Sequence, residues 1–395
     1  MLSRLTCDDR QKKDARQPMG NNPGVIMANQ EKRRGKPKAT ARSQRQSGKS
    51  GKKNGKHIGG AVEECREEGI VRHSELPKAH TDSVMSIIIA EDCIYTASRD
   101  KTLKRWKVGR NPGGRFELQH EFDVPLGVTC LCMCSVGEWL FCGLGSGAIR
   151  GFSTGTRTGF LLSAHSKRCS TLLVHEAVLL SGGADASVKC WMMDPSTQMF
   201  NNTHSITEGL CGATNCLSVL DGHLWVGGLS GISIIQMETF KVVHQVMPNK
   251  SVAGFLVFQG HIIVSYSDGT TCYFDTAGQQ KHTLVPLPSG PVLCIAGLET
   301  GPRLLCGHAK GQVSSVGLPM MDPRAYWQAF ERCKVQSIAC AGHDGIFIIG
   351  GENGALQIWQ SLNGGQAFFS GTEGHGAPIA CQYSKANPSA CNASG

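Results

Sequence analysis

The stretch Ser98-Arg-Asp-Lys-Thr-Leu-Lys-Arg-Trp106 joins two β runs through a turn and ends in a tryptophan. The apolar run Cys93-Ile-Tyr-Thr-Ala-Ser98 leads into it, and a histidine, His80, opens the same unit. Runs of β-branched and aromatic residues separated by turn residues predict a hairpin of neighbouring strands. The turn acid Asp100 stands six residues before Trp106, and this offset can be searched along the chain.

The same pattern returns six more times. A second clear copy contains His165, Asp185 and Trp191, and a third contains Asn353 and Trp359. The six-residue offset also locates weaker copies, each with a short apolar run before the turn. The closing positions are Trp106, Phe152, Trp191, Gln236, Phe274, Val316 and Trp359. Their spacing lies close to the ~40–45 residues of one four-stranded propeller blade.

The histidine opener, the Ser-x-Asp-x-Thr-x-Lys-x-Trp hairpin and the period resemble WD40 repeats over roughly residues 69–375. The resemblance implies an all-β chain with a single seven-bladed β-propeller. Two stacked β-sandwiches would not repeat a turn and an aromatic at a fixed offset. The sequence departs from the family pattern because no Trp is followed by Asp and Gln236 replaces an aromatic. The predicted domains are a basic tail (1–66), the propeller (67–375) and a flexible C-terminal tail (376–395).

The resemblance also implies a hydrogen-bonded chain within a blade, running from the opener His through a strand hydroxyl and the turn Asp to the Trp. In the first unit the hydroxyl is either Thr96 or Ser98. The predicted structural residues are His80, Ser98, Asp100, Trp106, His165, Asp185, Trp191 and Trp359. A His and an Asp near a Ser also suggest a hydrolase triad, but recurrence in separate repeats favours the structural interpretation.

The ring can close through either end of the chain, because residues 69–76 and residues 365–370 both fit the outer strand of the last blade. The sequence leaves this choice open. Tyr326, Trp327 and Phe330 lie between the last two units. They suit either an exposed aromatic patch or an outer strand with half of its side chains packed, and the second is preferred.

The 18 cysteines are scattered through predicted strands and no Cys-x-x-Cys pair occurs, so reduced thiols are expected. Cys130, Cys132 and Cys134 should share one face of a strand, which does not suit a tetrahedral metal. The phosphate-binding, zinc-protease and nucleophile-elbow motifs are missing from the sequence. We therefore expect no enzyme activity, no metal and no cofactor.

The net charge of +9 is unevenly distributed along the chain. Residues 1–60 hold 16 Lys and Arg against 4 Asp and Glu, a net of +12, and the remainder carries −3. The tail has no aromatic residue before position 67, so we expect disorder. Its basic clusters suit phosphate contacts or nuclear import. The residues are Lys32, Arg33, Arg34, Lys36, Lys38, Lys52, Lys53 and Lys56.

These patterns predict a protein-interaction scaffold that presents the rims of a propeller to proteins or peptides. The resemblance places the usual partner surface on the face with the opener loops, at Asp82, Arg99, Lys167, Arg168 and Glu352. One alternative is a ribonucleoprotein factor whose tail contacts RNA; another is a ubiquitin-ligase substrate receptor, although the adaptor motif Trp-Asp-x-Arg is missing. We expect no membrane span or secretion, a nuclear or cytoplasmic location, and a monomer within a larger complex.

Overall fold

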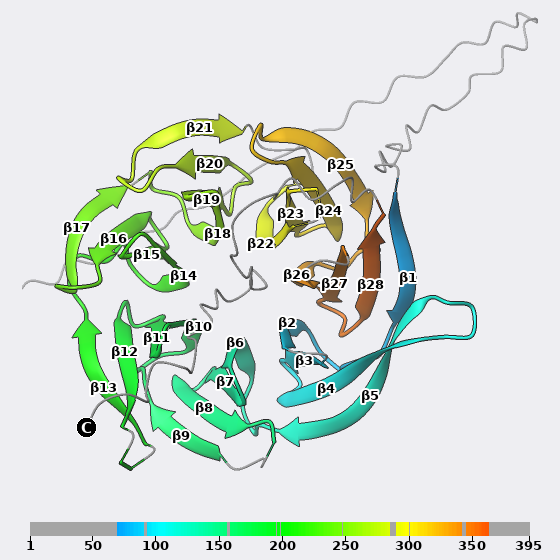
Figure 1. Cartoon of the computed structure of the whole chain (residues 1–395), viewed down its shortest axis with the longest axis horizontal. Helices are drawn as coiled ribbons and strands as arrows, with labels where there is room; N and C mark the ends of the chain where they lie inside the picture. The colour runs from blue at the N-terminus through cyan, green and yellow to red at the C-terminus, as the bar shows by residue number, and fades with distance from the viewer. Residues whose placement is uncertain are drawn as a thin grey trace, which may run out of the picture. The chain divides into compact units, whose positions relative to one another are not determined.

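The computed structural model describes residues 69–90, 93–155, 159–194, 196–197, 199–246, 248–284, 290–299, 301–341 and 345–362. The predicted tails (1–66 and 376–395) lie outside these ranges, as do the basic clusters and residues 365–370. Within the described ranges the strands form seven antiparallel four-stranded sheets arranged around a central axis (Figure 1). The predicted all-β, seven-bladed propeller is confirmed.

Each blade is built in chain order from the inside outwards. The first blade is β2 (Val84–Ala90), β3 (Cys93–Ser98), β4 (Thr102–Arg110) and β5 (Phe116–Pro125). The second is β6 (Cys130–Val136), β7 (Trp139–Leu144), β8 (Ala148–Ser153) and β9 (Gly159–Ser163). The third is β10 (Cys169–His175), β11 (Val178–Gly183), β12 (Val188–Asp194) and β13 (Met199–Ile206). The fourth is β14 (Thr214–Leu220), β15 (His223–Gly228), β16 (Ile232–Gln236) and β17 (Lys241–Val246).

The remaining blades follow the same order. The fifth is β18 (Val252–Phe258), β19 (His261–Tyr266), β20 (Thr271–Phe274) and β21 (Gln280–Leu284). The sixth is β22 (Val292–Leu298), β23 (Arg303–His308), β24 (Gln312–Gly317) and β25 (Asp322–Gln328). The seventh takes β26 (Val335–Ala341), β27 (Ile346–Gly351) and β28 (Leu356–Ser361) from the end of the described chain and β1 (Ile70–Leu76) from its start. All seven closing positions found in the sequence lie on the third strand of their blades.

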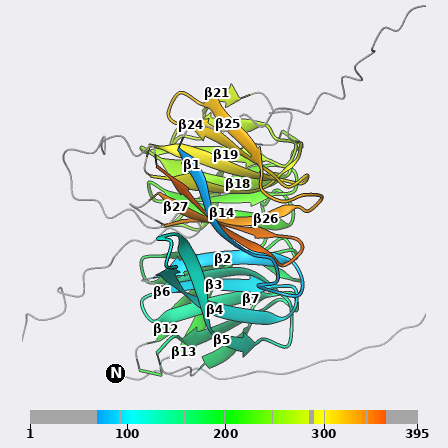
Figure 2. The same cartoon turned by 90° about the vertical axis from the view of Figure 1, so that its right-hand side faces the viewer.

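The seventh blade closes the ring through the N-terminal side of the propeller. β1 pairs antiparallel with β28, from Ile70 opposite Ser361 to Leu76 opposite Leu356. Figure 2 shows β1, in blue, beside the orange strands of this blade. Between the two closing candidates, residues 69–76 therefore provide the outer strand. Residues 322–328 form the outer strand β25, in which Trp327 is buried and Tyr326 is half-buried, as the preferred interpretation predicts for these two residues. Phe330 lies just after the strand and is buried.

A layer of small residues lies near the axis, where neighbouring blades meet. The fifth residue of each second strand is small throughout the ring: Ala97, Gly143, Gly182, Gly227, Ser265, Gly307 and Gly350. A Cβ at Gly182 would lie 2.7 Å from Thr171 of its own blade and 2.4 Å from Thr214 of the next. Real Cβ atoms do not approach other atoms so closely. The size of the side chains in this layer therefore determines how closely successive blades can pack.

The small-residue layer faces a β-bulge in every inner strand. The residues opposite it are Ser86, Cys132, Thr171, Cys216, Gly254, Cys294 and Ser337, and the register shifts just before each of them. A bulge changes the side to which the following residues point. Consequently Cys130 packs toward the first blade and Cys134 toward the third. The expectation that Cys130, Cys132 and Cys134 share one face is wrong, because strict alternation fails at the bulge.

Replacing Gly182 with alanine should lower the free energy of unfolding by about 1–3 kcal/mol, because the added methyl overpacks the contact with Thr171 and Thr214. Urea denaturation of the full chain measures this change. Gly155→Ala is the matched control, since its nearest neighbour would be 3.7 Å from the new Cβ. An equal effect of the two substitutions would show that the layer does not limit packing.

Candidate interaction face and central channel

One face of the ring is fixed by a backbone hydrogen bond that recurs in all seven blades. In six blades the residue directly after the second strand donates its N–H to the carbonyl of the residue directly before the inner strand, as Arg99 does to Ser83 at 3.0 Å. In the fourth blade Ser230, two residues after β15, donates to Cys211, three residues before β14. The remaining pairs are Gly145–Thr129, Ala184–Arg168, Ser267–Ser251, Ala309–Pro291 and Glu352–Lys334. We call the surface formed by these loops and turns the opener face. Its backbone is held to the rigid sheets at seven points.

In the first blade, a buried hydrogen-bond chain links the opener loop to the third strand. The Trp106 indole N–H donates to Thr96 Oγ1 at 2.8 Å, and Thr96 Oγ1 lies 2.7 Å from His80 Nε2. His80 Nδ1 lies 2.9 Å from Asp100 Oδ2. Because an ionised carboxylate only accepts, Nδ1 carries the proton of a neutral ring and Nε2 accepts from the Thr96 hydroxyl. Trp106 thus donates to Thr96, Thr96 donates to His80, and His80 donates to Asp100.

The third blade repeats the arrangement with a serine as the hydroxyl donor. Trp191 donates to Ser181 Oγ at 2.9 Å, Ser181 Oγ lies 2.9 Å from His165 Nε2, and His165 Nδ1 lies 3.1 Å from Asp185. In the first blade the hydroxyl of this chain belongs to Thr96. The structure gives Ser98 a different role, since its hydroxyl donates to Asp82 O and accepts from the Asp100 N–H, which shapes the turn.

Burial and hydrogen bonding set the protonation of these chains. Burial lowers the pKa of His80 and of His165, although the neighbouring carboxylates act in the opposite direction. Burial alone would raise the pKa of Asp100, but donors from Thr102, Thr81 and His80 lower it below its usual value. The histidines are therefore neutral and Asp100 is ionised at neutral pH.

Replacing Thr96 with valine should destabilise the chain by about 1–3 kcal/mol, because the indole N–H of Trp106 and Nε2 of His80 lose their buried partner. Equilibrium unfolding in urea is the measurement. Thr96→Ser should retain most of the stability, and Thr81→Val, at an exposed position, should have little effect. A Thr96→Val variant as stable as the Thr81→Val variant would contradict the proposed role of the hydrogen-bond chain.

The free energy of unfolding should fall as the pH is lowered from about 6.5 toward 5. The folded pKa of each buried histidine lies below the unfolded value, so the unfolded state binds more protons in this range. The stability that the neutral histidines contribute is present above their pKa in the unfolded state. It is lost as the pH falls through their lower pKa in the folded state. Urea titrations at several pH values test this. His165→Asn should reduce the change in the free energy of unfolding with pH. Stability that rises on acidification would contradict the assignment.

Other blades tether their opener loops through residues that the sequence patterns did not reveal. In the seventh blade Gln357 donates to Ala329 O at 2.7 Å and accepts from the Trp359 indole at 2.9 Å, because Ile349 replaces the strand hydroxyl. In the sixth, His308 contacts Gly290 O and Ser314. In the fourth blade, Ser233 Oγ accepts from the Cys211 N–H and donates to Gly209 O. In the fifth, Lys250 of the opener loop donates to Thr270 Oγ1 and pairs with Asp268. A polar residue inside an otherwise apolar strand is the signal that marks Gln357, His308 and Ser233.

The predicted rim residues all lie on the opener face, in two groups. Asp82 and Glu352 are both bonded to Ser83, where the first and seventh blades join: Ser83 donates its backbone N–H to the Asp82 carboxylate and its hydroxyl to Glu352 O. Glu352 also pairs with Lys334. Arg99 is exposed in the turn of the first blade. Lys167 and Arg168 are exposed in the loop that opens the third blade, so the second blade separates them from Arg99.

The opener face has more unpaired positive than negative charge. Among the described residues, seven basic side chains of these loops and turns have no acidic partner: Lys78, Arg99, Lys101, Lys167, Arg168, Lys310 and Arg332. Asp100 and Asp185 are occupied in the buried chains, and Asp268 and Glu352 pair with lysines. The unpaired acids are Asp82, Glu208 and Glu331. The face is therefore suited to an anionic partner surface.

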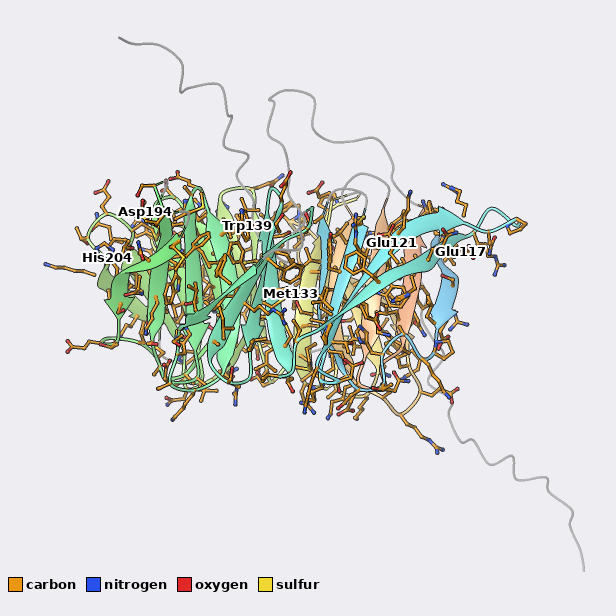
Figure 3. The ribbon with its side chains drawn as sticks, turned by 90° about the horizontal axis from the view of Figure 1, so that it is seen from below. Glu117, Glu121, Met133, Trp139, Asp194 and His204 are labelled. Carbon is orange, nitrogen blue, oxygen red and sulfur yellow. The ribbon has the colours of Figure 1, made fainter. Side chains whose placement is uncertain are left out.

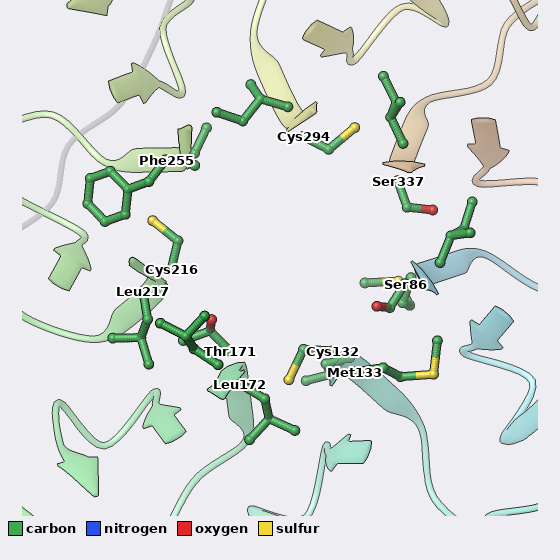
Figure 4. Close-up of a pocket in the computed structure, with 18 of the residues that line it drawn as sticks. Ser86, Cys132, Met133, Thr171, Leu172, Cys216, Leu217, Phe255, Cys294 and Ser337 are labelled. Atoms are coloured by element: carbon green, nitrogen blue, oxygen red, sulfur yellow. The ribbon is translucent and has the colours of Figure 1, made fainter. Parts of the chain in front are cut away.

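The inner strands enclose a central cavity of about 250 Å³ (Figure 4). Its wall includes the thiols of Cys132, Cys216 and Cys294, which come from the second, fourth and sixth blades. Burial raises the pKa of each, so they are protonated at neutral pH. Cys132 Sγ and Cys294 Sγ contact the first carbonyl of the next inner strand at 3.7 and 3.8 Å. In the described part of the chain, no cluster of three potential ligands is placed to hold a metal ion.

Comparison with known proteins identifies the fold. The WD40 β-propeller domain of Doa1 superimposes with a TM-score of 0.62 at 17% identity, covering 74% of this chain and 97% of that domain. The chain therefore has the WD40-type propeller fold. Zinc finger CCCH domain-containing protein 17 of Oryza sativa subsp. japonica is 22% identical over 282 residues, which are 68% of this chain. The chain spans 61% of that relative's length. No family model matches the sequence.

WD40 propellers generally mediate protein interactions and are typically non-catalytic. The part of the chain that the structure describes contains no helix long and apolar enough to cross a membrane.

Proposed function

We propose that this protein is a non-catalytic interaction scaffold that binds an acidic segment of a partner protein on its opener face. The unpaired positive charge of that face carries the proposal. Arg99, Lys167 and Arg168 are exposed and have no acidic partner among the described residues, while the backbone of their loops is held by hydrogen bonds to neighbouring segments. A rigid loop loses little conformational entropy when it binds, which favours affinity.

The buried polar groups support a structural role over a catalytic one. The Thr96 hydroxyl is fully buried and already bonded to both Trp106 and His80. A nucleophile must reach its substrate and a base must be able to exchange protons. The group of Thr96, His80 and Asp100 meets neither condition. Its repetition in the third blade, with Trp191 as the closing residue, fits a structural element of the repeat.

The triple charge reversal Arg99→Glu, Lys167→Glu and Arg168→Glu tests this function. Affinity purification of the tagged full-length chain should recover partner proteins that the reversed variant loses and that high salt weakens. Lys107, Arg115 and Lys241 are exposed basic residues away from the opener face, and their triple reversal is the matched control. If both triple variants retain the same partners, the opener face is not the binding site.

A second candidate function is nucleic-acid or ribonucleoprotein binding through the tail, which the +12 charge of residues 1–60 favours. Lys32, Arg33, Arg34, Lys36 and Lys38 form its densest cluster. Binding would depend strongly on salt and little on sequence. The same cluster fits nuclear import, and we propose a location in the nucleus, the cytoplasm or both.

Deleting residues 1–60 should remove RNA or DNA retention and nuclear enrichment while the propeller stays folded. Purification of full-length and shortened chains, with and without nuclease, separates the candidates. Nuclease-sensitive recovery that depends on the tail supports the second function, and nuclease-resistant recovery by the shortened chain supports the first. Recovery of a cullin adaptor would instead support a ubiquitin-ligase receptor. Unchanged nucleic-acid retention by the shortened chain would contradict the role of the tail.

A further inference from the structure

A groove of about 610 Å³ lies between the outer parts of the first and second blades. Tyr95, Phe122 and Val124 line it from the first blade, and Phe152 and Leu161 line it from the second. Leu126 and Leu144 also line it. Its volume lies within the range of sites that accept small ligands or single side chains of a partner. Figure 1 shows the two blades side by side, with β5 and β9 as their outer strands.

The groove exists because the second blade presents small residues toward the first. Gly159 pairs with Phe152, and Ala148 pairs with Ser163 at the other end of β9. A Cβ at Gly159 would lie 2.7 Å from Gly151 O, so a larger residue cannot fill the space without a backbone shift. β5, the outer strand of the first blade, has ten residues, whereas β9, the outer strand of the second, has only five.

Leu161 increases the apolar surface at the edge of the groove. It lies opposite Arg150 in the β8–β9 pair, and 65% of its surface is exposed. Phe122 and Phe152 provide aromatic walls nearby. An exposed leucine alone needs no explanation, but one that borders an aromatic groove indicates a contact surface for another apolar group.

The one charge in the groove without a counter-ion among the described residues is the guanidinium of Arg150. It is half-buried, and Nη1 donates to Pro125 O at 2.9 Å. The other charged residue of the lining, Asp123, already pairs with His120 at 2.6 Å and with Lys104 at 3.6 Å. A guanidinium has five N–H donors, and most of those of Arg150 remain available.

We propose that this groove binds a short peptide segment of a partner protein in which an aromatic or aliphatic side chain lies close to an aspartate or glutamate. The apolar side chain enters between Phe122, Phe152 and Leu161. The carboxylate takes the remaining donors of Arg150, in the paired geometry that guanidinium and carboxylate groups favour. A nucleic acid fits less well, because the walls are apolar and a single cation faces the groove. This site is separate from Arg99, Lys167 and Arg168, so the inference stands whether or not the opener face binds its proposed partner.

Peptide display on the full-length chain tests the proposal. A library of random dodecapeptides is selected on the wild-type protein and depleted on the groove-filling variant Ala148→Phe. Recovered peptides should combine an apolar residue with an acidic one. Fluorescence anisotropy of the labelled peptides should then show that Arg150→Ala weakens binding by about tenfold or more, which is the loss expected for a charge-assisted pair. Arg150→Lys should retain part of the affinity, because the charge is kept and the paired geometry is lost.

Matched substitutions separate the groove from general surface effects. Leu161→Asp should also abolish binding, and it changes an exposed side chain, so it tests the groove even if Ala148→Phe fails to fold. Lys189, two residues before Trp191 as Arg150 is two before Phe152, gives the control Lys189→Ala. Val243, an exposed apolar residue of β17, gives the control Val243→Asp. Both controls, and the triple reversal on the opener face, should bind the peptides within about twofold of wild type.

Three outcomes would overturn the proposal. The first is a selection in which no peptide prefers the wild-type chain over the Leu161→Asp variant. The second is peptide binding that Arg150→Ala and Lys189→Ala reduce equally. The third comes from a photoreactive residue placed at position 161 of the full chain: a crosslink to residues 1–68 or 363–395 of the same chain, or to a second copy, would show that the groove is covered by the protein itself.

Discussion

The fold depends on how closely successive sheets can approach one another around a common axis. Blades are wedges, so the space between them narrows toward the centre, and the side chains there must become small. The protein meets this requirement with glycine, alanine or serine at the same position of all seven second strands, opposite a bulge in each inner strand. In the seventh blade the Ser337 hydroxyl donates to Val84 O of the first blade at 2.9 Å, so the ring closes at its centre as well as through β1 and β28.

The tethers of the opener loops are more varied than the layer at the centre. Two blades use the chain of histidine, hydroxyl and tryptophan, while the seventh uses Gln357 and the sixth uses His308. Different side chains reach the same result, a carbonyl or N–H of the opener loop bonded to the sheet. The geometry therefore does not require one residue type, which accounts for blades that form without the full sequence motif.

The sequence predicted the fold well because the repeat is set by local features: turn glycines, apolar runs and the offset from the turn residue to the closing position. Those features located the third strand of all seven blades, even at Gln236 and Val316. The bulge in each inner strand was not predicted, because small polar residues there look like ordinary strand residues, and Cys130, Cys132 and Cys134 were misplaced for that reason. The groove also escaped prediction, since it depends on which face of β8 and β9 meets the first blade.

The described ring and the basic tail have different charge distributions. The net −3 of residues 61–395 coexists with unpaired basic side chains on the opener face, because acidic residues such as Glu138, Glu176 and Asp221 lie in turns at the ends of strands away from that face. Figure 3 shows the ring from its side, with Trp139 and Asp194 toward the rim opposite the opener face. The opener face therefore offers complementary charge to a partner with an acidic segment.

Hydrogen–deuterium exchange on the full chain, free and in complex with its purified partners, tests most directly whether the opener face binds them. We expect slower exchange in the loops and turns at residues 78–83, 99–101 and 165–168, and unchanged exchange in the opposite turns at 137–138, 176–177 and 221–222. Protection of the opposite turns with no change in the opener loops would contradict it.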